Sequence, residues 1–217
     1  MDITRNEISR LSQDLLVETI TTNLRAITIN LQPKEQVLIF YYEKQPTEDE
    51  VSLYNAVLKK ISLIFTNTSV IGKKIVLPKP EPIPLRQFDQ WIFCRYEKNA
   101  SLFKIKTFYK EITKLNILMA SQYALLGNIA ENLRAISLES VGNDLSYFFF
   151  YDKDPNHEDK YLSDVIKSDV LWSIEGVSGS LKRFVLPEPE KIPSQEGHVL
   201  VYRRYEKEPL DSAHVNN

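Results

Sequence analysis

The sequence has little of several residue types on which common functional sites depend. Its one cysteine, Cys94, can form neither an intramolecular disulfide nor a cysteine-based zinc site. The three histidines, His157, His198 and His214, do not occur at metal-ligand spacing. The six glycines form no phosphate-binding loop, and no Gly-x-Ser-x-Gly elbow is present. We therefore expect that the protein is not an enzyme and has neither a cofactor nor a metal ion.

Long apolar runs and a strong net charge are also absent. No run approaches the ~20 apolar residues needed to span a bilayer. The first residues, Met-Asp-Ile-Thr-Arg, lack the apolar core of a signal peptide. A net charge of −2 argues against broad binding to nucleic-acid phosphates. We expect a cytoplasmic protein that contacts neither a membrane nor nucleic acid directly.

The sequence does contain an internal repeat. The segment Asn-Leu-Arg-Ala-Ile at residues 23–27 occurs again at residues 132–136, a shift of 109 residues. The same shift aligns residues 3–98 with residues 112–207 without a gap, and 30 of the 96 aligned positions are identical. Unrelated sequences share far fewer, so the chain contains two copies of one unit. We predict a first repeat at 1–98, a linker at 99–111, a second repeat at 112–207 and a flexible tail at 208–217.

Hydrophobic periodicity predicts six elements in each repeat. Residues 3–20 have the spacing of an amphipathic helix, and residues 24–31 and 36–43 form a predicted hairpin. A second helix begins after Thr47, which with Glu50 matches a capping box. Two further strands, separated by a Pro-rich crossing, complete the repeat. These strands are predicted at 73–77 and 91–97, with the crossing at 78–84. In the second repeat the predicted helices are 112–129 and about 156–172, and the predicted strands are 133–140, 145–152, 184–186 and 199–206.

This order, α-β-β-α-β-β, predicts an α+β fold in which an antiparallel sheet carries two helices on one face. Because twofold pairs are the commonest assemblies, we predict that the two linked units form a pseudo-dimer, which is a monomer with internal pseudo-twofold symmetry. The linker at 99–111 also has apolar residues at helical spacing. It is therefore predicted to lengthen the first helix of the second repeat.

Charged residues that recur between the repeats are candidates for a structural or binding role. They are Arg25, Arg95 and Glu97 in the first repeat, and Arg134, Arg204 and Glu206 in the second. Strand alternation places Arg25 on the side of Ile27, and Arg134 on the side of Ile136. Two roles remain open for the set. One is an Arg–Glu network at the end of the sheet, and the other is an anion site between the repeats.

Acidic residues gather where the second helix of each repeat begins. They are Glu48, Asp49 and Glu50 in the first repeat, and Asp152, Asp154, Glu158 and Asp159 in the second. Acidic side chains stabilise a helix N-terminus, so helix capping is one role. Contact with a basic protein partner is the other. Residues 1–109 carry 15 Lys+Arg and 12 Asp+Glu, whereas residues 110–217 carry 12 and 17, so the second repeat is the favoured binder.

The order of these segments resembles that of small bacterial immunity proteins. The resemblance rests on Asn-Leu-Arg-Ala-Ile, on Phe-Tyr-Tyr-Glu at 40–43, and on the acidic Thr-Glu-Asp-Glu at 47–50. The Pro-rich crossing and the final Val-Tyr-Arg-Arg-Tyr-Glu at 201–206 extend it. Immunity proteins of this kind belong to contact-dependent inhibition and related polymorphic toxin systems.

The resemblance implies a non-catalytic protein that binds a cognate toxin domain and covers its active site or substrate path. Many such toxins attack nucleic acids and present basic clefts, so the acidic residues become candidate contacts. The alternative is a regulatory protein that binds a small ligand or anion between the repeats, with Arg25 and Arg134 as the residues that bind the anion.

Overall fold

The computed structural model describes residues 17–31, 35–65, 68–84, 89–95, 109–194 and 197–206. Most of the helix predicted at 3–20, most of the linker, Glu97 and the predicted tail lie outside these residues. No helix within the described ranges is long and apolar enough to cross a membrane.

The described part of the first repeat contains a mixed sheet and one helix. Strands β2 (Leu24–Leu31) and β3 (Glu35–Tyr42) form an antiparallel hairpin. Helix α2 (Glu48–Ile64) then leads to β4 (Ser69–Val76), which pairs in parallel with β3. After the Pro-rich crossing, β5 (Asp89–Cys94) returns antiparallel to β2. The resulting strand order is β4-β3-β2-β5.

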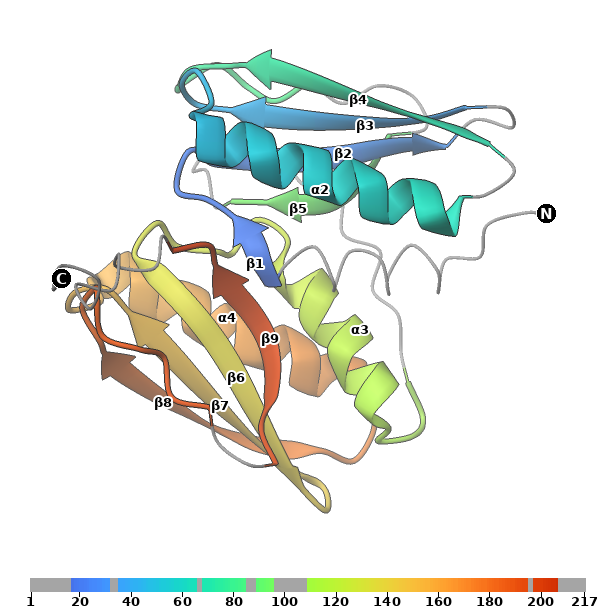
Figure 1. The fold of residues 1–217 in the computed structure, drawn as a ribbon. Coiled ribbons are helices and arrows are strands. Elements are labelled where there is room, and N and C mark those ends of the chain that lie inside the picture. Colours follow the sequence, from blue (N-terminus) through green and yellow to red (C-terminus); the bar gives the residue numbers. More distant parts are fainter. Residues whose placement is uncertain are drawn as a thin grey trace, which may run out of the picture.

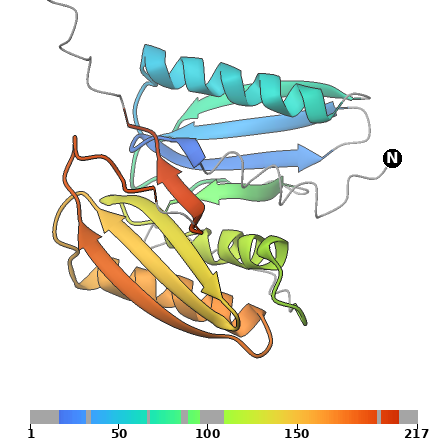
Figure 2. The same ribbon diagram turned by 60° about the horizontal axis from the view of Figure 1, so that its bottom comes forward.

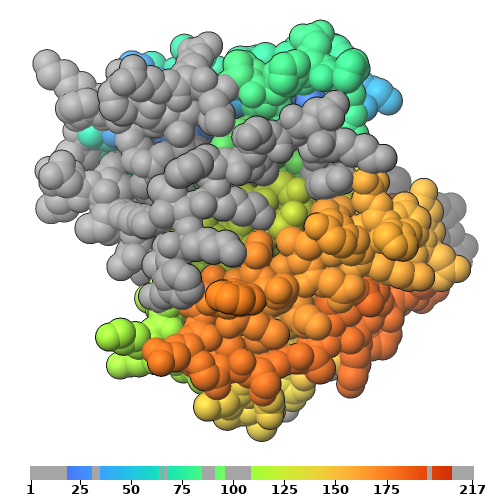
Figure 3. Space-filling model, turned by 180° about the vertical axis from the view of Figure 1, so that it is seen from behind, coloured from blue at the N-terminus to red at the C-terminus, as the bar shows by residue number. Residues whose placement is uncertain are grey.

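The second repeat has the same arrangement (Figure 1). Its elements are α3 (Lys114–Leu125), β6 (Leu133–Val141), β7 (Asp144–Tyr151), α4 (His157–Ser173), β8 (Ser178–Val185) and β9 (Val199–Arg204). Helices α3 and α4 lie on one face of this sheet, and Figure 3 shows α4 at the surface when the molecule is seen from behind. The prediction of two tandem α+β units is confirmed.

The prediction that each sheet is wholly antiparallel is wrong. Strands β3 and β4 pair in parallel along their length, as do β7 and β8. Helices α2 and α4 are the cause, because each carries the chain back to the end of the sheet at which the previous strand began. A crossover of this kind joins parallel neighbours, whereas a short turn joins antiparallel ones.

Both faces of each sheet are covered, which explains why the hairpin strands are so rich in apolar residues. On one face of the first sheet, Tyr54 of α2 packs edge-on against Phe40, with ring centroids 5.0 Å apart. On the other face, Leu77 and Ile83 of the Pro-rich crossing pack against a cluster that includes Tyr41. In the second repeat the crossing covers Phe148 and Phe150 in the same way.

The last residues of the first predicted helix form a strand instead. Strand β1 (Val17–Ile20) pairs in parallel with β9 of the other repeat and completes the order β1-β9-β6-β7-β8 (Figures 1 and 2). The helix prediction is therefore wrong at these four residues. The segment is Val-Glu-Thr-Ile, and its β-branched residues suit a strand once β9 offers hydrogen-bonding partners.

The equivalent segment of the second repeat departs from its prediction in the same place. Helix α3 ends at Leu125 rather than at 129, and Ile129 forms an isolated parallel bridge with Arg95 of the first repeat. At its other end, α3 begins at Lys114 after the N-cap residue Thr113. Tyr109 instead bridges Ile174, so the described part of the linker does not lengthen the helix.

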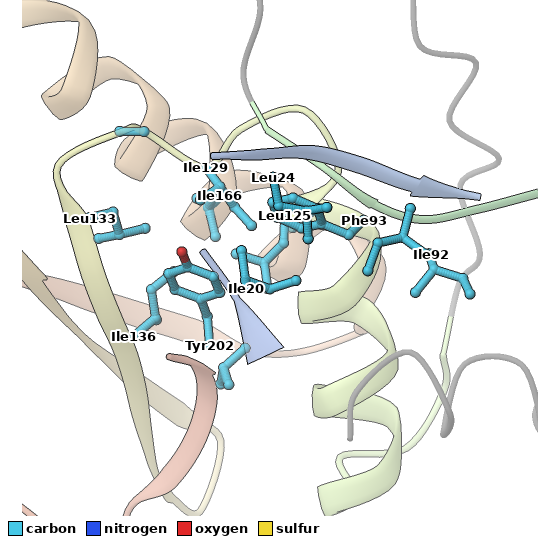
Figure 4. Close-up of a cluster of buried hydrophobic side chains, with 14 of the residues drawn as sticks. Ile20, Leu24, Ile92, Phe93, Leu125, Ile129, Leu133, Ile136, Ile166 and Tyr202 are labelled. Atoms are coloured by element: carbon cyan, nitrogen blue, oxygen red, sulfur yellow. The ribbon is translucent and has the colours of Figure 1, made fainter. Parts of the chain in front are cut away.

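One hydrophobic core runs through both repeats. In Figure 4, Ile20, Leu24 and Phe93 of the first repeat lie close to Ile129 and Tyr202 of the second. Each of these five side chains is at most 2% exposed. The backbone contributes as well, because the N–H of Gly127 donates to the carbonyl of Cys94 at 2.8 Å. A shared apolar core of this kind holds two units in one arrangement.

Candidate functional site

The repeated Asn-Leu-Arg-Ala-Ile segment forms a β-bulge at the start of each central strand. Leu24 lies opposite Tyr42 and Ala26 lies opposite Tyr41, so Arg25 is an extra residue in its strand. The register shifts in the same way around Arg134 in the second repeat. Because a bulge interrupts the alternation of faces, Arg25 points to the Pro-rich crossing. The prediction that it shares a side with Ile27 is therefore wrong, and the same holds for Arg134 and Ile136.

Arg25 and Arg134 hold the Pro-rich crossings onto the sheets. Arg25 donates hydrogen bonds to the carbonyls of Leu77 and Glu81, at 2.5 and 2.8 Å. Arg134 makes the equivalent bonds in the second repeat. A Pro-rich segment cannot pair its carbonyls within a sheet, and a guanidinium offers five N–H donors. Since the two arginines are 0% and 1% exposed, they are closed to a ligand.

Arg134 also forms a bidentate ion pair with Glu206. Its Nε and Nη2 atoms each lie 2.5 Å from a carboxylate oxygen. The bonded carboxylate raises the pKa of the Arg134 guanidinium. This contact ties the start of β6 to the end of β9. The equivalent of Glu206 in the first repeat, Glu97, lies outside the described residues.

Arg95 and Arg204 occupy equivalent places between the two repeats. Arg95 donates to the carbonyl of Thr22 and to the carboxylate of Glu43, the latter at 2.6 Å. Arg204 donates to the carbonyl of Glu131 and to the carboxylate of Asp152, each at 3.1 Å. A shift of 109 residues relates both sets of partners. The structure thus preserves the contacts, although the residues that supply them differ.

The second repeat neutralises its arginine more fully. Arg204 also contacts Glu188 at 2.6 Å and lies 3.7 Å from Glu206. Burial opposes the charge on Arg204, but its bonds to Glu188 and Asp152 raise its pKa. Burial also raises the pKa of Asp152, but the Glu188 N–H and the Arg204 guanidinium hold that pKa below its usual value.

Two of the acidic residues for which helix capping and partner contact were both open, Glu50 and Asp159, cap helices. The Glu50 carboxylate accepts the backbone N–H of Thr47 at 2.8 Å and the side-chain amide of Asn23 at 2.9 Å. Asp159 makes the same contacts with Asn156 and Asn132. Glu50 is 6% exposed and Asp159 is 8% exposed. The repeated asparagine therefore links the bulged strand to the capping box of the following helix.

The other predicted acidic residues lie nearer the surface. Glu48 and Asp154 are exposed, and Asp49, Asp152 and Glu158 are partly exposed. Of these five, Asp49 and Asp152 line a cleft between the repeats, together with Glu50. The structure thus brings acidic residues from the two helix starts into one site, although only part of the predicted set meets there.

This cleft has a volume of about 800 Å³ and is lined by both repeats. The first repeat contributes Thr21, Thr22, Asn23, Glu43, Lys44, Gln45, Thr47, Asp49, Glu50 and Arg95, and the second contributes Glu131, Asn132, Asp152, Lys153, Glu188, Arg204, Tyr205 and Glu206. Seven of these residues are acidic and four are basic, a net charge of −3.

Comparison with protein families identifies the group to which the chain belongs. The model of the MafI2 immunity protein family matches twice, over residues 5–97 and 114–206. The chain belongs to the MafI2 immunity protein family. The resemblance to immunity proteins, with the unit present in tandem, is confirmed. A search of curated proteins found no match.

In this tandem MafI2 family member, three acidic residues of the cleft were not predicted from the sequence: Glu43, Glu131 and Glu188. Glu43 aligns with Asp152, and that alignment was the one signal for it. Glu131 and Glu188 align with Thr22 and Lys79, so the repeat gave no signal for them. Glu131 nevertheless forms an ion pair with Lys79 across the two repeats, and this hydrogen bond lowers the pKa of Glu131.

Proposed function

We propose that the protein protects its cell by binding a cognate toxin domain in the cytoplasm and covering the active site or substrate path of that domain. The observation that carries this proposal is the match of both repeats to one immunity protein family. Protection by coverage requires binding alone, so the protein needs no catalytic group. The shared core supports this role, because a rigid binding surface loses little conformational entropy when it binds.

The partner, in this proposal, presents a basic surface. The supporting feature is the set of acidic residues near the helix starts: Glu48, Asp49, Asp152, Asp154 and Glu158. Complementary charge steers two proteins together and penalises wrong partners. Glu50 and Asp159 are left out of the proposed contacts because they cap helices and are buried.

The alternative role, as a binder of small anions, has weaker support. Arg25 and Arg134 are buried against the Pro-rich crossings and do not line the cleft. Arg95 and Arg204 do line it, but each already bonds to carboxylates. A cleft with an excess of acidic groups repels an anion.

Binding of the purified toxin domain to the full chain tests the proposal. The probe is the cognate toxin domain, identified first by a pull-down with the full chain from lysate of the source organism. The test variant carries Glu48→Lys, Asp154→Lys and Glu158→Lys. The control variant carries Glu111→Lys, Glu139→Lys and Glu175→Lys, which change the net charge equally but are not at the start of α2 or α4.

We expect the test variant to lose affinity by about 10- to 100-fold, because each lost or reversed charge contact contributes on the order of 1 kcal/mol. The control should change affinity by less than about threefold. Equal losses in the two variants would show that overall charge, rather than this surface, governs binding. If the wild-type chain does not bind the toxin domain, the proposed function is wrong.

A further inference from the structure

We propose that the cleft between the repeats receives a single cationic segment of the toxin domain, and that Glu131 and Glu188 set the direction in which this segment enters. One chain then binds one toxin domain, although the chain contains two repeats. The inference rests on the proposed function and specifies the place, the number and the orientation of the contacts.

Equivalent residues of the two repeats line the same cleft. Asn23 and Asn132, Glu43 and Asp152, Lys44 and Lys153, and Arg95 and Arg204 form four such pairs in its lining. Both members of a pair reach one cavity only if that cavity lies on the pseudo-twofold axis relating the repeats. A site on such an axis exists once in the molecule. Duplication of the unit therefore creates one cleft, whereas it creates two copies of every surface away from the axis.

The size of the cleft and the buried polar groups in its lining favour a polypeptide segment as the occupant. A volume of about 800 Å³ lies in the range of established binding sites. Asn132 is 8% exposed, and its Oδ1 atom accepts no hydrogen bond within the described residues. The equivalent Oδ1 atom of Asn23 accepts the backbone N–H of Lys44 at 2.8 Å.

A second buried group at the cleft has an unused hydrogen-bonding atom. Arg95 is 4% exposed, and its Nε donor also has no partner in the described part of the chain. Buried polar atoms are nearly always hydrogen-bonded in native structures. A polypeptide supplies both N–H donors and carbonyl acceptors, whereas a simple ion supplies only one kind of group. The charge of the lining selects a segment that carries lysine or arginine.

At two positions the second repeat contributes an acidic lining residue where the first repeat has a neutral or basic counterpart. Thr22 of the first repeat corresponds to Glu131, and Lys79 corresponds to Glu188. Among the residues that line the cleft, the first repeat carries a net charge of −1 and the second a net charge of −2. The side chains of Glu131 and Glu188 are 64% and 50% exposed. Each carboxylate has further acceptor sites beyond its present ion pair, so both can receive a cationic side chain.

Exchanging these two residues for their counterparts tests the proposal. The variant Glu131→Thr with Glu188→Lys gives the second repeat the residues of the first and raises the net charge by three. Its matched control is Asp169→Lys with Glu175→Thr, which also introduces the first repeat's residues and also adds three charges. Asp169 lies in the last turns of α4 and Glu175 lies just after that helix, and neither residue lines the cleft. The probe is again the purified toxin domain with the full chain.

We expect one toxin domain per wild-type chain by sedimentation equilibrium. The exchange variant should weaken binding by at least about tenfold, and the control by less than about threefold. Glu188→Gln with Glu131→Thr serves as a second variant, because it avoids placing a lysine beside Arg204. Two toxin domains per chain, or an affinity unaffected by either cleft variant, would overturn the cleft proposal alone. Absence of wild-type binding would overturn the proposed function and this inference together.

Discussion

Ile20 lies opposite Arg204 in the parallel pairing of β1 with β9. Ile129, 109 residues after Ile20, lies opposite Arg95 in the same parallel sense. Each repeat therefore gives the segment that precedes its Asn-Leu-Arg-Ala-Ile motif to the last strand of the other repeat. A reciprocal exchange of this kind makes the sheet of each repeat depend on its neighbour.

The exchange predicts that the two repeats unfold in one cooperative transition. Each repeat contains one tryptophan, Trp91 and Trp172. The variants Trp172→Phe and Trp91→Phe therefore report on the first and the second repeat separately. We expect both fluorescence curves to have the same midpoint in urea, because the core is continuous. Two midpoints that differ beyond experimental error would show that the repeats are independent.

Truncation of the shared core should destabilise both repeats. Ile129→Ala is expected to lower the free energy of unfolding by about 2–5 kcal/mol, since it removes a buried branched side chain. Both tryptophan reporters should record the same loss. Val141→Ala, at a residue that is 67% exposed, is the control and should cost less than about 0.5 kcal/mol.

Arg134→Met should destabilise the protein far more than Arg183→Met does. Loss of the Arg134 guanidinium leaves the carbonyls of the crossing and the Glu206 carboxylate without their donors, and a broken buried pair costs about 3–5 kcal/mol. Arg183 is partly exposed and pairs with the exposed Asp164, an interaction that contributes about 1 kcal/mol or less, and it also donates to the Ser163 hydroxyl and the Lys160 carbonyl. Urea unfolding of the two variants gives the comparison. Equal losses would contradict a structural role for Arg134.

The lowered pKa values of Asp152 and Glu131 predict acid sensitivity. A carboxyl group whose pKa is lower in the folded state stabilises the fold above its unfolded pKa, near 4. That contribution is lost as the pH falls through the folded pKa. The variant Asp152→Asn with Glu131→Gln should therefore lose less stability between pH 5 and pH 2, given as approximate limits. Asp154→Asn, at an exposed position of the same repeat, is the control variant.

In the first repeat the second helix carries a large residue where it packs on a small residue of the edge strand. In the second repeat the sizes at these two positions are reversed. Gly72 lies beneath Tyr54, and a Cβ atom added to it would be 2.2 Å from the tyrosine hydroxyl oxygen. The second repeat has Leu181 and Ser163 at the equivalent positions. Gly72→Ala should therefore cost about 1–3 kcal/mol through overcrowding.

Tyr54→Ser should relieve part of that cost when it is combined with Gly72→Ala. The measurement is a double-mutant cycle from urea unfolding. We expect the double variant to lose less stability than the sum of the single variants. Additive losses would show that the tyrosine and the glycine are not in steric competition.

Local patterns were sufficient for the central elements of each repeat. The predicted strand at residues 24–31 has the observed bounds, and Thr47 caps α2 as its sequence indicates. These features depend on neighbouring residues, so periodicity and capping signals record them. The position of Arg25 could not be predicted in the same way, because a bulge changes the face of a strand without changing its composition.

Local sequence patterns could not predict strand β1 or the cleft, for a different reason. Val17 pairs with Arg203, at the far end of the chain, and no periodicity near Val17 records that partner. Glu131 reaches Lys79 only because the two repeats pack together. The double match to the immunity family supplies a role, while the packing of the repeats supplies the candidate surface for it.

Co-expression in a heterologous bacterial host tests the protective role most directly. The cognate toxin domain is induced alone, with the full chain, or with an equal amount of the chain carrying Glu131→Thr and Glu188→Lys. Growth should stop with the toxin alone, resume with the wild-type chain, and resume less fully with the variant. Continued arrest in the presence of abundant folded wild-type chain would contradict the proposal that this protein neutralises the toxin by binding it.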